Sequence, residues 1–252
     1  MQVKVVKFNK GLLALRLAIV IACAVALSMA TRGLLSKPRG MAYEYNAVCT
    51  ILDIRGDGLR VVPVIAGNPG KGEYFDRMMV RLKPIAAING TYFDPDYRTL
   101  GDIVIDGKVV QRGCQRQGIG FTPGGGIGFL ERRGSRRIDW RGYESGIAAG
   151  PRLVRNGKGD IDVVRDGFRP AAVTKKAPRS VIGATKDGRL ILCVVKDSVD
   201  LKTTARIMQE LGAHNAVNLD GGMSCALYSR GKSLDTPVVA LSNIIVVVPR
   251  KK

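Results

Sequence analysis

Histidine, tryptophan and aromatic residues in general are scarce in this sequence, which holds one histidine, one tryptophan and 6% aromatic residues. Because His214 is the only histidine, a hydrolase with a serine–histidine–acid triad would have to use it. It follows Gly212 at the end of an expected helix, where a solvated or capping role is the stronger interpretation. No Gly-x-Ser-x-Gly motif is present either. A triad hydrolase is therefore disfavoured.

Cysteine pairs with metal-binding spacing are also missing. None of the five cysteines forms a Cys-x-x-Cys pair, which with the single histidine argues against a structural zinc site. Cys193 lies in the apolar run LILCVV and is expected to be a buried thiol rather than part of a disulfide. The sequence indicates no cofactor, and it leaves open whether a metal ion is required.

Acidic residues are few, since 21 aspartates and glutamates face 40 lysines and arginines, for a net charge of +19. Such a surface attracts anionic partners, such as nucleic acid, acidic lipid headgroups, or an anionic glycan or sugar-phosphate. A simple solvated surface is the alternative interpretation. No RNA-recognition, zinc-finger or basic-zipper pattern is present, so no specific nucleic-acid motif supports that partner. The dense basic segment Arg132–Gly142, which holds Trp140, is read as a solvated loop, with glycan or lipid contact as the alternative.

The N-terminus reads as a targeting segment. Lys4, Lys7 and Lys10 precede a run from residue 12 to 30 that is apolar except for Arg16 and Ser28. This pattern is typical of a secretory signal, and the run is also nearly long enough to be an uncleaved membrane anchor. We therefore expect an exported protein, periplasmic or extracellular, with membrane association through residues 12–30 as the alternative to cleavage. The expected organisation is a signal or anchor at 1–30, a linker at 31–45 and one domain at 46–252.

The rest of the chain predicts strands joined by tight turns. Asp106-Gly107, Asn156-Gly157 and Asp166-Gly167 each lie between apolar arms, as in β-hairpins. Residues 180–197 predict another hairpin, with Gly188 in its turn and a second arm apolar enough for a central strand. With 31 glycines and 46% hydrophobic residues, a turn-rich fold with a sizeable core is expected.

Two helices are expected. Residues 200–212 have a capping aspartate, apolar residues at helical spacing and a glycine stop, and residues 74–82 suggest a second helix. Each is followed by an apolar strand, and a last strand is expected in NIIVVVP. The predicted fold class is α+β: a mixed, hairpin-rich β-sheet with a few packed helices, preceded by the N-terminal signal or anchor helix.

Polar residues interrupt the apolar pattern at three strand ends. Asn89 and Asp220 each follow an apolar strand, and Arg179 stands at the entrance of one. Strand ends in one sheet can converge on a cleft. Singly, each has a simpler explanation: Asn-Gly and Asp-Gly-Gly are common turns, and Arg179 could be a surface charge.

Four segments in order carry a family resemblance: INGTYFD (88–94), AAGPRLVRNGK (148–158), APRSVIGATKDGRLILCVVKD (177–197) and TTARIMQELGAHNAVNLDGGMS (203–224). Together they resemble the phosphodiester glycosidase family, the bacterial relatives of the lysosomal mannose-6-phosphate uncovering enzyme. The resemblance extends over roughly residues 46–249. It implies a hydrolase that cleaves the glycosidic bond of a sugar-1-phosphodiester.

The resemblance also nominates site residues. It implies catalytic roles for Asp220, Arg179 and Asn89, with Asn89 holding sugar hydroxyls or the attacking water. The residues it implies for substrate binding are Gly90, Thr91, Gly150, Ser180, Gly221, Gly222 and Ser224. The chemistry agrees, because arginine offers a fork of donors to a phosphodiester and a carboxylate can stabilise an oxocarbenium-like state. If a second acid is needed, Asp94, Asp102 and Glu144 are the candidates.

The glycine turn departs from the family's usual Asp-Gly-Gly-Gly-Ser-Ser, because Met223 and Cys225 replace a glycine and a serine. Met223 could narrow the pocket or weaken the chemistry. Three hypotheses follow: an exported phosphodiester glycosidase acting on a surface polysaccharide or sugar-phosphate, a catalytically weak glycan- or phosphoglycan-binding module of the same fold, and, with least support, an electrostatic binder of nucleic acid or lipid.

Overall fold

The computed structural model describes residues 44–67, 70–132 and 134–250, which all belong to one compact unit. The expected signal or anchor at 1–30 and nearly all of the expected linker lie outside the described residues. Within the described ranges, no helix has the length and apolar character needed to cross a membrane.

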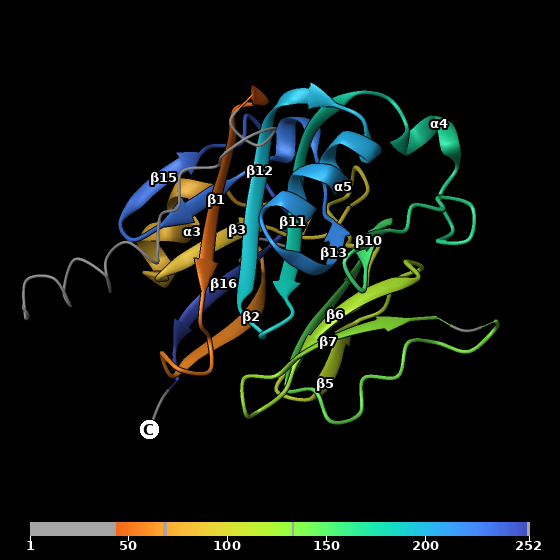
Figure 1. Ribbon diagram of the computed structural model, residues 1–252. Coiled ribbons are helices and arrows are strands. Elements are labelled where there is room, and N and C mark those ends of the chain that lie inside the picture. The colour runs from red at the N-terminus through yellow and green to blue at the C-terminus, as the bar shows by residue number, and fades with distance from the viewer. Residues whose placement is uncertain (1–43, 68–69, 133, 251–252) are drawn as a thin grey trace, which may run out of the picture. The chain divides into compact units, whose positions relative to one another are not determined.

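A six-stranded sheet holds two of the family-like segments at its centre. Its strand order is β1-β12-β11-β13-β9-β10 (Figure 1). The bounds are Ala47–Leu52 (β1), Leu190–Val199 (β12), Ala177–Thr185 (β11), Ala213–Asn218 (β13), Arg152–Arg155 (β9) and Lys158–Gly159 (β10). Helix α5 (Leu201–Glu210) packs on one face through Ala205, Ile207 and Met208. Its N-cap is Asp200, whose side chain accepts the Thr203 N–H at 2.7 Å.

A second, five-stranded sheet has the order β15-β14-β3-β16-β2. Its strands are Lys232–Asp235 (β15), Leu227–Ser229 (β14), Ala86–Asn89 (β3), Asn243–Pro249 (β16) and Leu59–Ile65 (β2). Helix α3 (Phe75–Leu82) covers one face with Phe75 and Met78, which are 1% and 0% exposed. Strands β3 and β14 contact β12 of the first sheet, so the other faces of the two sheets pack together.

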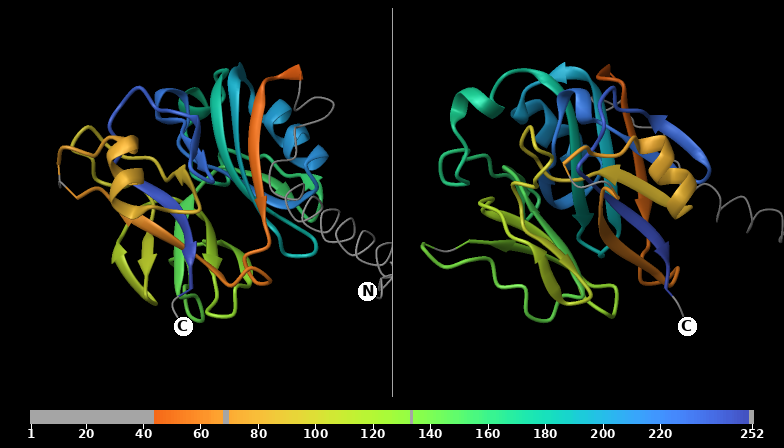
Figure 2. Two further views of the ribbon diagram at one scale, coloured as in Figure 1. Left: turned by 90° about the vertical axis from the view of Figure 1, so that its left-hand side faces the viewer. Right: turned by 180° about the vertical axis from the view of Figure 1, so that it is seen from behind.

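The result is a stack of four layers, α3, the second sheet, the first sheet and α5, seen edge-on in Figure 2. This stacking explains the long apolar arm in the sequence. Strand β12 lies in the interior of its sheet with α5 on one side and the second sheet on the other, and residues 190–195 are fully buried. The expectation of a central strand covered on both faces is confirmed.

A third sheet, β5-β4-β8-β6-β7, forms the remaining part of the domain. Its strands are Lys108–Gln111 (β5), Ile103–Ile105 (β4), Ser145–Ala149 (β8), Gln117–Phe121 (β6) and Ile127–Glu131 (β7). Trp140 packs on it where the strands carry glycine, since a Cβ at Gly146 would lie 2.4 Å from its ring. The indole N–H donates to Asp102 at 3.0 Å. Trp140 is thus part of a small core.

The expected α+β fold with two packed helices is confirmed, but the single mixed sheet is wrong. In the described part of the chain there are three sheets, and every strand pair is antiparallel. The helices α3 and α5 do connect β2 to β3 and β12 to β13. In each case another strand, β16 or β11, is inserted between the connected pair, so no neighbours run parallel. Two short elements, α4 (Pro170–Val173) and the 3-10 helix η1 (Gly222–Ser224), were not expected.

The hairpin expectations have mixed outcomes. Asp106-Gly107 and Asn156-Gly157 form two-residue turns in which every φ is positive, between 50° and 77°. The hairpin at Gly188 is also confirmed, as β11 and β12. Asp166-Gly167 is not a hairpin turn. Asp166 is 1% exposed and accepts N–H bonds from the Gln117 side chain at 2.8 Å and the Arg152 backbone at 2.7 Å.

This buried carboxylate gives the first test. We expect Asp166→Ala to lower the free energy of unfolding by about 3 kcal/mol, because two buried N–H donors lose their acceptor. The matched control is Asp162→Ala, which removes an exposed carboxylate that caps the Arg165 N–H and should cost less than about 1 kcal/mol. Urea unfolding measures both variants, and equal losses would contradict the structural role of Asp166.

Candidate active site

The end of β3, the start of β11 and the end of β13 meet at one corner of the two packed sheets. The Leu219 N–H donates to the Ser180 carbonyl at 2.8 Å, which fixes the exit of β13 to the first sheet. The next N–H, of Asp220, donates to the Gly90 carbonyl at 3.1 Å, directly after β3 of the second sheet. Two consecutive peptides therefore bridge both sheets at Asp220.

Asn89 closes the same corner with its side chain. Its amide N–H donates to the Asp220 carbonyl at 2.7 Å, and its amide oxygen accepts the Ala226 N–H at 3.1 Å. Asn89 is 1% exposed, so both polar ends are committed to backbone on either side of the glycine turn. In this geometry Asn89 holds the backbone on both sides of the glycine turn, and its contact with sugar or water stays a prediction.

The carboxylate of Asp220 is partly buried in this corner. Burial raises its pKa to about 6, against the opposing effect of hydrogen bonds from the Ser224 hydroxyl and the Gly221 N–H, the latter at 3.0 Å. Ser224 is 6% exposed, so the fold fixes the position of the hydroxyl that donates to the Asp220 carboxylate. A carboxylate of this pKa is mostly ionised at neutral pH and still able to take up a proton.

The glycine turn lies tightly against β11. A Cβ at Gly221 would lie 2.8 Å from the Pro178 carbonyl, so only glycine lets the turn approach this closely. Gly222 has a φ of 61°. Met223 is 66% exposed, so its side chain points to solvent and does not fill the turn. Cys225 is 4% exposed, and burial raises the pKa of its thiol to about 12, so it packs as a small neutral group beside Ser180.

Arg179 is buried rather than a surface charge, with 5% of its surface exposed. Its Nε donates to the Val199 carbonyl at 3.3 Å, and Nη2 donates to the carbonyls of Val173, at 3.1 Å, and Lys175. Burial lowers the pKa of Arg179. No carboxylate among the described residues forms an ion pair with it. The guanidinium is thus held by backbone oxygens while its charge is not neutralised.

Tyr92 and Asn218 belong to the same corner and were not among the expected site residues. The Tyr92 hydroxyl donates to the Gly150 carbonyl at 2.8 Å and accepts the Asn218 side-chain N–H at 2.8 Å. Burial raises the pKa of Tyr92, with a further contribution from the Asp220 charge, so the phenol is neutral. Tyr92 also interacts electrostatically with Arg179, so it lies within range of both the Asp220 carboxylate and the Arg179 guanidinium. Both residues lie inside the motifs, but nothing in the sequence pattern separated them from the core.

The remaining expected residues mainly shape the backbone. Asn243, also not expected, accepts the Thr91 N–H at 2.8 Å and donates to the Thr91 carbonyl at 3.0 Å. A Cβ at Gly90 would lie 1.8 Å from the Asn243 side-chain oxygen, so this position requires glycine. Gly150 has a φ of 137° and packs under Phe168. The Thr91 hydroxyl is buried without a hydrogen-bond partner among the described residues, and the Ser180 side chain interacts with the Cys225 thiol.

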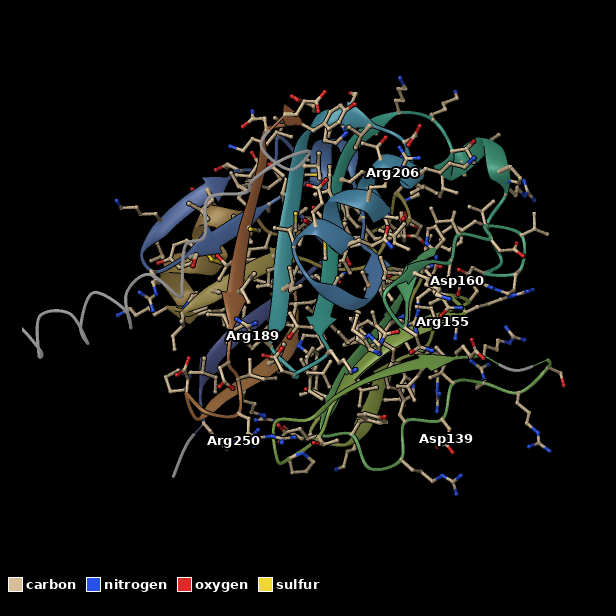
Figure 3. All side chains as sticks on the ribbon, in the orientation of Figure 1. Asp139, Arg155, Asp160, Arg189, Arg206 and Arg250 are labelled. Atoms are coloured by element: carbon tan, nitrogen blue, oxygen red, sulfur yellow. The ribbon has the colours of Figure 1, made fainter. Side chains whose placement is uncertain are left out.

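The candidates for a second acid are committed elsewhere. Asp94 caps its own loop by accepting the N–H groups of Asp96 and Arg98, and Asp102 accepts the Gly113 N–H and the Trp140 indole. Glu144 forms an ion pair with Arg250, at 2.8 Å. Arg250 lies near the C-terminus of the chain and is labelled in Figure 3. His214 lies on β13 beside Gly157, where its carbonyl accepts the Gly157 N–H. Asp220 is therefore the carboxylate that the corner itself supplies.

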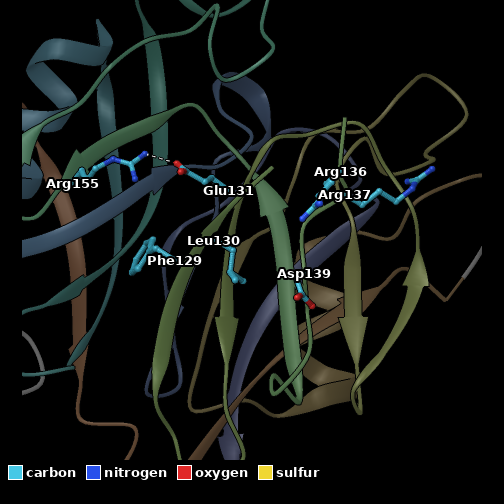
Figure 4. Close-up of a pocket in the computed structure, with 7 residues that line it drawn as sticks. All are labelled: Phe129, Leu130, Glu131, Arg136, Arg137, Asp139 and Arg155. Atoms are coloured by element: carbon cyan, nitrogen blue, oxygen red, sulfur yellow. Dashed lines mark hydrogen bonds and ion pairs between the residues drawn. The ribbon is translucent and has the colours of Figure 1, made fainter. Parts of the chain in front are cut away.

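The basic segment at 132–142 borders a separate pocket of ≈ 420 Å³ on the third sheet, shown in Figure 4. Arg136, Arg137 and Asp139 line it together with Arg155, which pairs with Glu131 at 2.9 Å. Trp140 is 6% exposed and faces the sheet, so it offers no open ring face to a glycan. Arg136 and Arg137 are exposed, as expected for a solvated loop.

Beside the glycine turn lies a hollow of ≈ 350 Å³. Its lining includes Pro178, Gly222, Met223, Cys225 and Val238. Pro178, which precedes Arg179, and Cys225, whose thiol interacts electrostatically with the Arg179 charge, both line this hollow. No group of three or more histidine, cysteine or acidic side chains suited to a metal ion occurs in the described ranges.

Comparisons with known proteins give the family and the fold. A family model described as phosphodiester glycosidase matches residues 83–248, which include every residue of the corner. No curated protein matches the chain. Among solved structures, the catalytic domain of zebrafish N-acetylglucosamine-1-phosphodiester alpha-N-acetylglucosaminidase, auto-inhibited by its pro-peptide, has a TM-score of 0.65 at 23% identity, covering 80% of this chain and 82% of that one.

Two further structures share the fold. A hypothetical protein from Synechocystis has a TM-score of 0.60 at 20% identity over 80% of this chain, which spans 58% of that protein's length. A putative exported protein from Burkholderia pseudomallei has a TM-score of 0.62 at 13% identity, covering 81% of this chain and 74% of that one.

The raised pKa of Asp220 predicts a pH-dependent stability. Because the folded-state pKa of about 6 exceeds the unfolded value of 3.8, the folded protein binds the proton more tightly, and stability falls as pH rises between these values. We expect wild type to lose on the order of 2 kcal/mol relative to Asp220→Asn between pH 4 and pH 7. Urea unfolding of both proteins across this range measures the difference. Parallel curves would show that Asp220 is not desolvated.

Proposed function

Since this chain belongs to the phosphodiester glycosidase family, we propose that it hydrolyses the glycosidic bond of a sugar-1-phosphodiester. One observation supports the proposal above the others. The corner holds a carboxylate whose pKa is raised to about 6 by burial, and Arg179, at the start of β11, is buried without an ion pair to any described carboxylate. An anionic substrate supplies the missing countercharge.

The proposed chemistry follows from these two groups. The phosphodiester binds at Arg179, whose planar guanidinium matches phosphate oxygens. The bond between the anomeric carbon and the bridging oxygen breaks, and its electron pair leaves with the phosphate. Phosphate is a good leaving group, so no strong general acid is required. Asp220 stabilises the oxocarbenium-like state and either takes the proton of the attacking water or attacks the anomeric carbon itself.

The other residues hold these two in place. Asn89 and Gly221 set the path of the backbone on both sides of Asp220, and the Ser224 hydroxyl orients its carboxylate. Tyr92 is a neutral phenol that interacts electrostatically with both groups, and Gly150 and Asn218 hold its hydroxyl, so it supports the site without adding charge. Each of these groups is fixed by the two packed sheets, which favours a preorganised site.

A catalytically weak binding module is the rival function, and the glycine turn bears on it. Met223 points to solvent and Cys225 is a buried, neutral thiol, so neither substitution adds a charge beside Asp220 or fills the turn with a large side chain. This favours the enzyme over the module. Protein that binds glycosyl phosphodiesters but releases no sugar from any of them would support the module.

We further propose that the substrate is an anionic surface glycan outside the cytoplasm. The net charge of +19 favours an anionic polymer, and the basic start and apolar run of the first 30 residues favour export. The structural neighbour from Burkholderia pseudomallei is described as a putative exported protein, which supports the same location.

The central test is the carboxylate. Asp220→Asn keeps the size and hydrogen-bond geometry of the side chain but removes its negative charge, so kcat/KM for release of sugar from a glycosyl phosphodiester should fall by about 1,000-fold or more. In wild type, kcat/KM should decrease about tenfold per pH unit below pH about 6, as Asp220 becomes protonated. Asp94→Asn, a carboxylate that only caps its loop, is the control and should keep its activity. Undiminished turnover by Asp220→Asn would remove Asp220 from the mechanism.

The arginine is tested through substrate binding. Arg179→Lys keeps the positive charge but loses the planar fork, so KM for the phosphodiester should rise about tenfold or more while kcat changes less. Arg152→Lys is the matched control, because Arg152 is also buried, at 3% exposed, but lies on β9 with its guanidinium over the Phe129 ring of the third sheet. A KM that rises equally in both variants, or in neither, would place the anion site elsewhere.

A further inference from the structure

A second hollow, of ≈ 700 Å³, lies next to the active-site corner and has no part in the proposed chemistry. It is formed by the start of α3 and the segment before it, the loop at Tyr97, and residues 238–240. We call it the α3 groove, and the side chains that matter below are Lys71, Tyr74, Arg77, Tyr97 and Val238.

The α3 groove adjoins the hollow beside the glycine turn. Val238 lines both, and its N–H donates to the Met223 carbonyl at 3.1 Å. The chain then runs along the groove to β16, where Asn243 holds Gly90 and Thr91 in the corner. A substrate bound in the hollow beside the glycine turn can therefore extend past Met223 and Val238 into the groove.

Two tyrosines give the groove flat apolar faces. Tyr74 is 56% exposed, although it stands at the start of a helix that buries its next residue, Phe75. Tyr97 stacks on Phe93 with centroids 5.3 Å apart, and its backbone has a φ of 60°, which is uncommon for an aromatic residue. The conformation is fixed because its carbonyl accepts the Ser242 hydroxyl at 2.6 Å and its ring packs where Gly72 lacks a Cβ. Tyr97 is thus a preorganised aromatic wall.

The charge of the groove is positive and only partly neutralised. Arg81 pairs with Glu73 at 2.6 Å. Lys71 and Arg77 are both exposed, and no carboxylate in the described ranges forms an ion pair with either. The Arg77 guanidinium lies over the Tyr74 ring, 5.7 Å from its centroid. Two exposed cations beside two aromatic faces suit a ligand that has both sugar rings and negative charges.

We propose that the α3 groove is a subsite for the part of the substrate beyond the phosphate, and that this part is an anionic oligosaccharide. The direction of binding rests on the proposed function, because it takes the phosphate at Arg179 as its starting point. Tyr74 and Tyr97 contact sugar rings, and Lys71 and Arg77 contact phosphate or carboxylate groups on them. The groove thereby selects polymeric over short substrates.

Binding tests the groove without turnover. The probe is an oligosaccharide whose sugars are joined by phosphodiesters, titrated into Asp220→Asn protein so that it is not cleaved, with a neutral oligosaccharide of equal length as comparison. The double variant Lys71→Ala/Arg77→Ala and the single variant Tyr74→Ala should each weaken binding of the anionic probe about tenfold. Tyr74→Ala should also weaken the neutral probe, and the charge variant should not.

The matched control is Lys202→Ala/Arg206→Ala, which removes two exposed charges from α5, where Arg206 is seen in Figure 3. It should bind within about twofold of the parent. Equal weakening by the control and the groove pair would show that net charge alone attracts the glycan. No weakening by either groove variant would also overturn the subsite.

Kinetics separate this inference from the proposed function. On a sugar-1-phosphate methyl diester, which is too short to reach the groove, the groove variants should keep the wild-type kcat/KM. On the oligosaccharide they should lose about tenfold, through KM. If wild type cleaves neither substrate, the proposed function fails, while the binding comparison still decides whether the groove recognises the glycan. An equal kinetic loss on both substrates would refute the groove as a separate subsite.

Discussion

The bridge at Leu219 and Asp220 is the constraint on which the site depends. One peptide N–H bonds to Ser180 in the first sheet and the next to Gly90 beside the second, while the Asn89 side chain holds the Asp220 carbonyl. These bonds fix the distance between the two sheets at this corner. Glycine at 90 and 221 is needed because the backbones approach too closely for a Cβ. Gly221, the residue after the Asp220 carboxylate, is therefore required first by packing.

The same packing sets the electrostatics. Burial without an opposite charge is unfavourable for both Asp220 and Arg179, and it moves the pKa of each toward the neutral form. Backbone carbonyls around Arg179 and hydrogen bonds to Asp220 offset only part of this cost. An anionic substrate recovers more of it at Arg179, and positive charge that develops at the sugar recovers it at Asp220. The burial of these two charges lowers the stability of the free protein, and the same charges can then stabilise the transition state more strongly.

Local features of the fold were predictable, and long-range ones were not. The turns at Asp106 and Asn156 follow from the need for positive φ, and the two helices follow from periodicity and caps. The insertion of β11 and β16 between helix-linked strands depends on pairing between distant residues, which no local pattern reports. Asp166 looked like a turn residue because Asp-Gly is common in turns, yet its carboxylate is buried by partners 14 and 49 positions away.

The site residues also divide into those that the sequence pattern predicted and those that it did not. Asp220 and Arg179 stood out because a charged residue interrupts an apolar strand pattern. Two features could be seen only in the three-dimensional arrangement. Asn89 is buried and bonds to backbone on both sides of the glycine turn, and Tyr92 interacts electrostatically with both Asp220 and Arg179. Met223 was read as an obstacle because the sequence gives its size but not its direction, and it points outward.

The central claim is that this corner breaks the bond on the sugar side of the phosphate. Hydrolysis of a glycosyl phosphodiester in water labelled with oxygen-18, followed by phosphorus NMR and mass spectrometry of the products, tests it most directly. The account predicts label in the anomeric hydroxyl of the released sugar and none in the phosphate. Label in the phosphate would show attack at phosphorus and would contradict the roles assigned to Asp220 and Arg179.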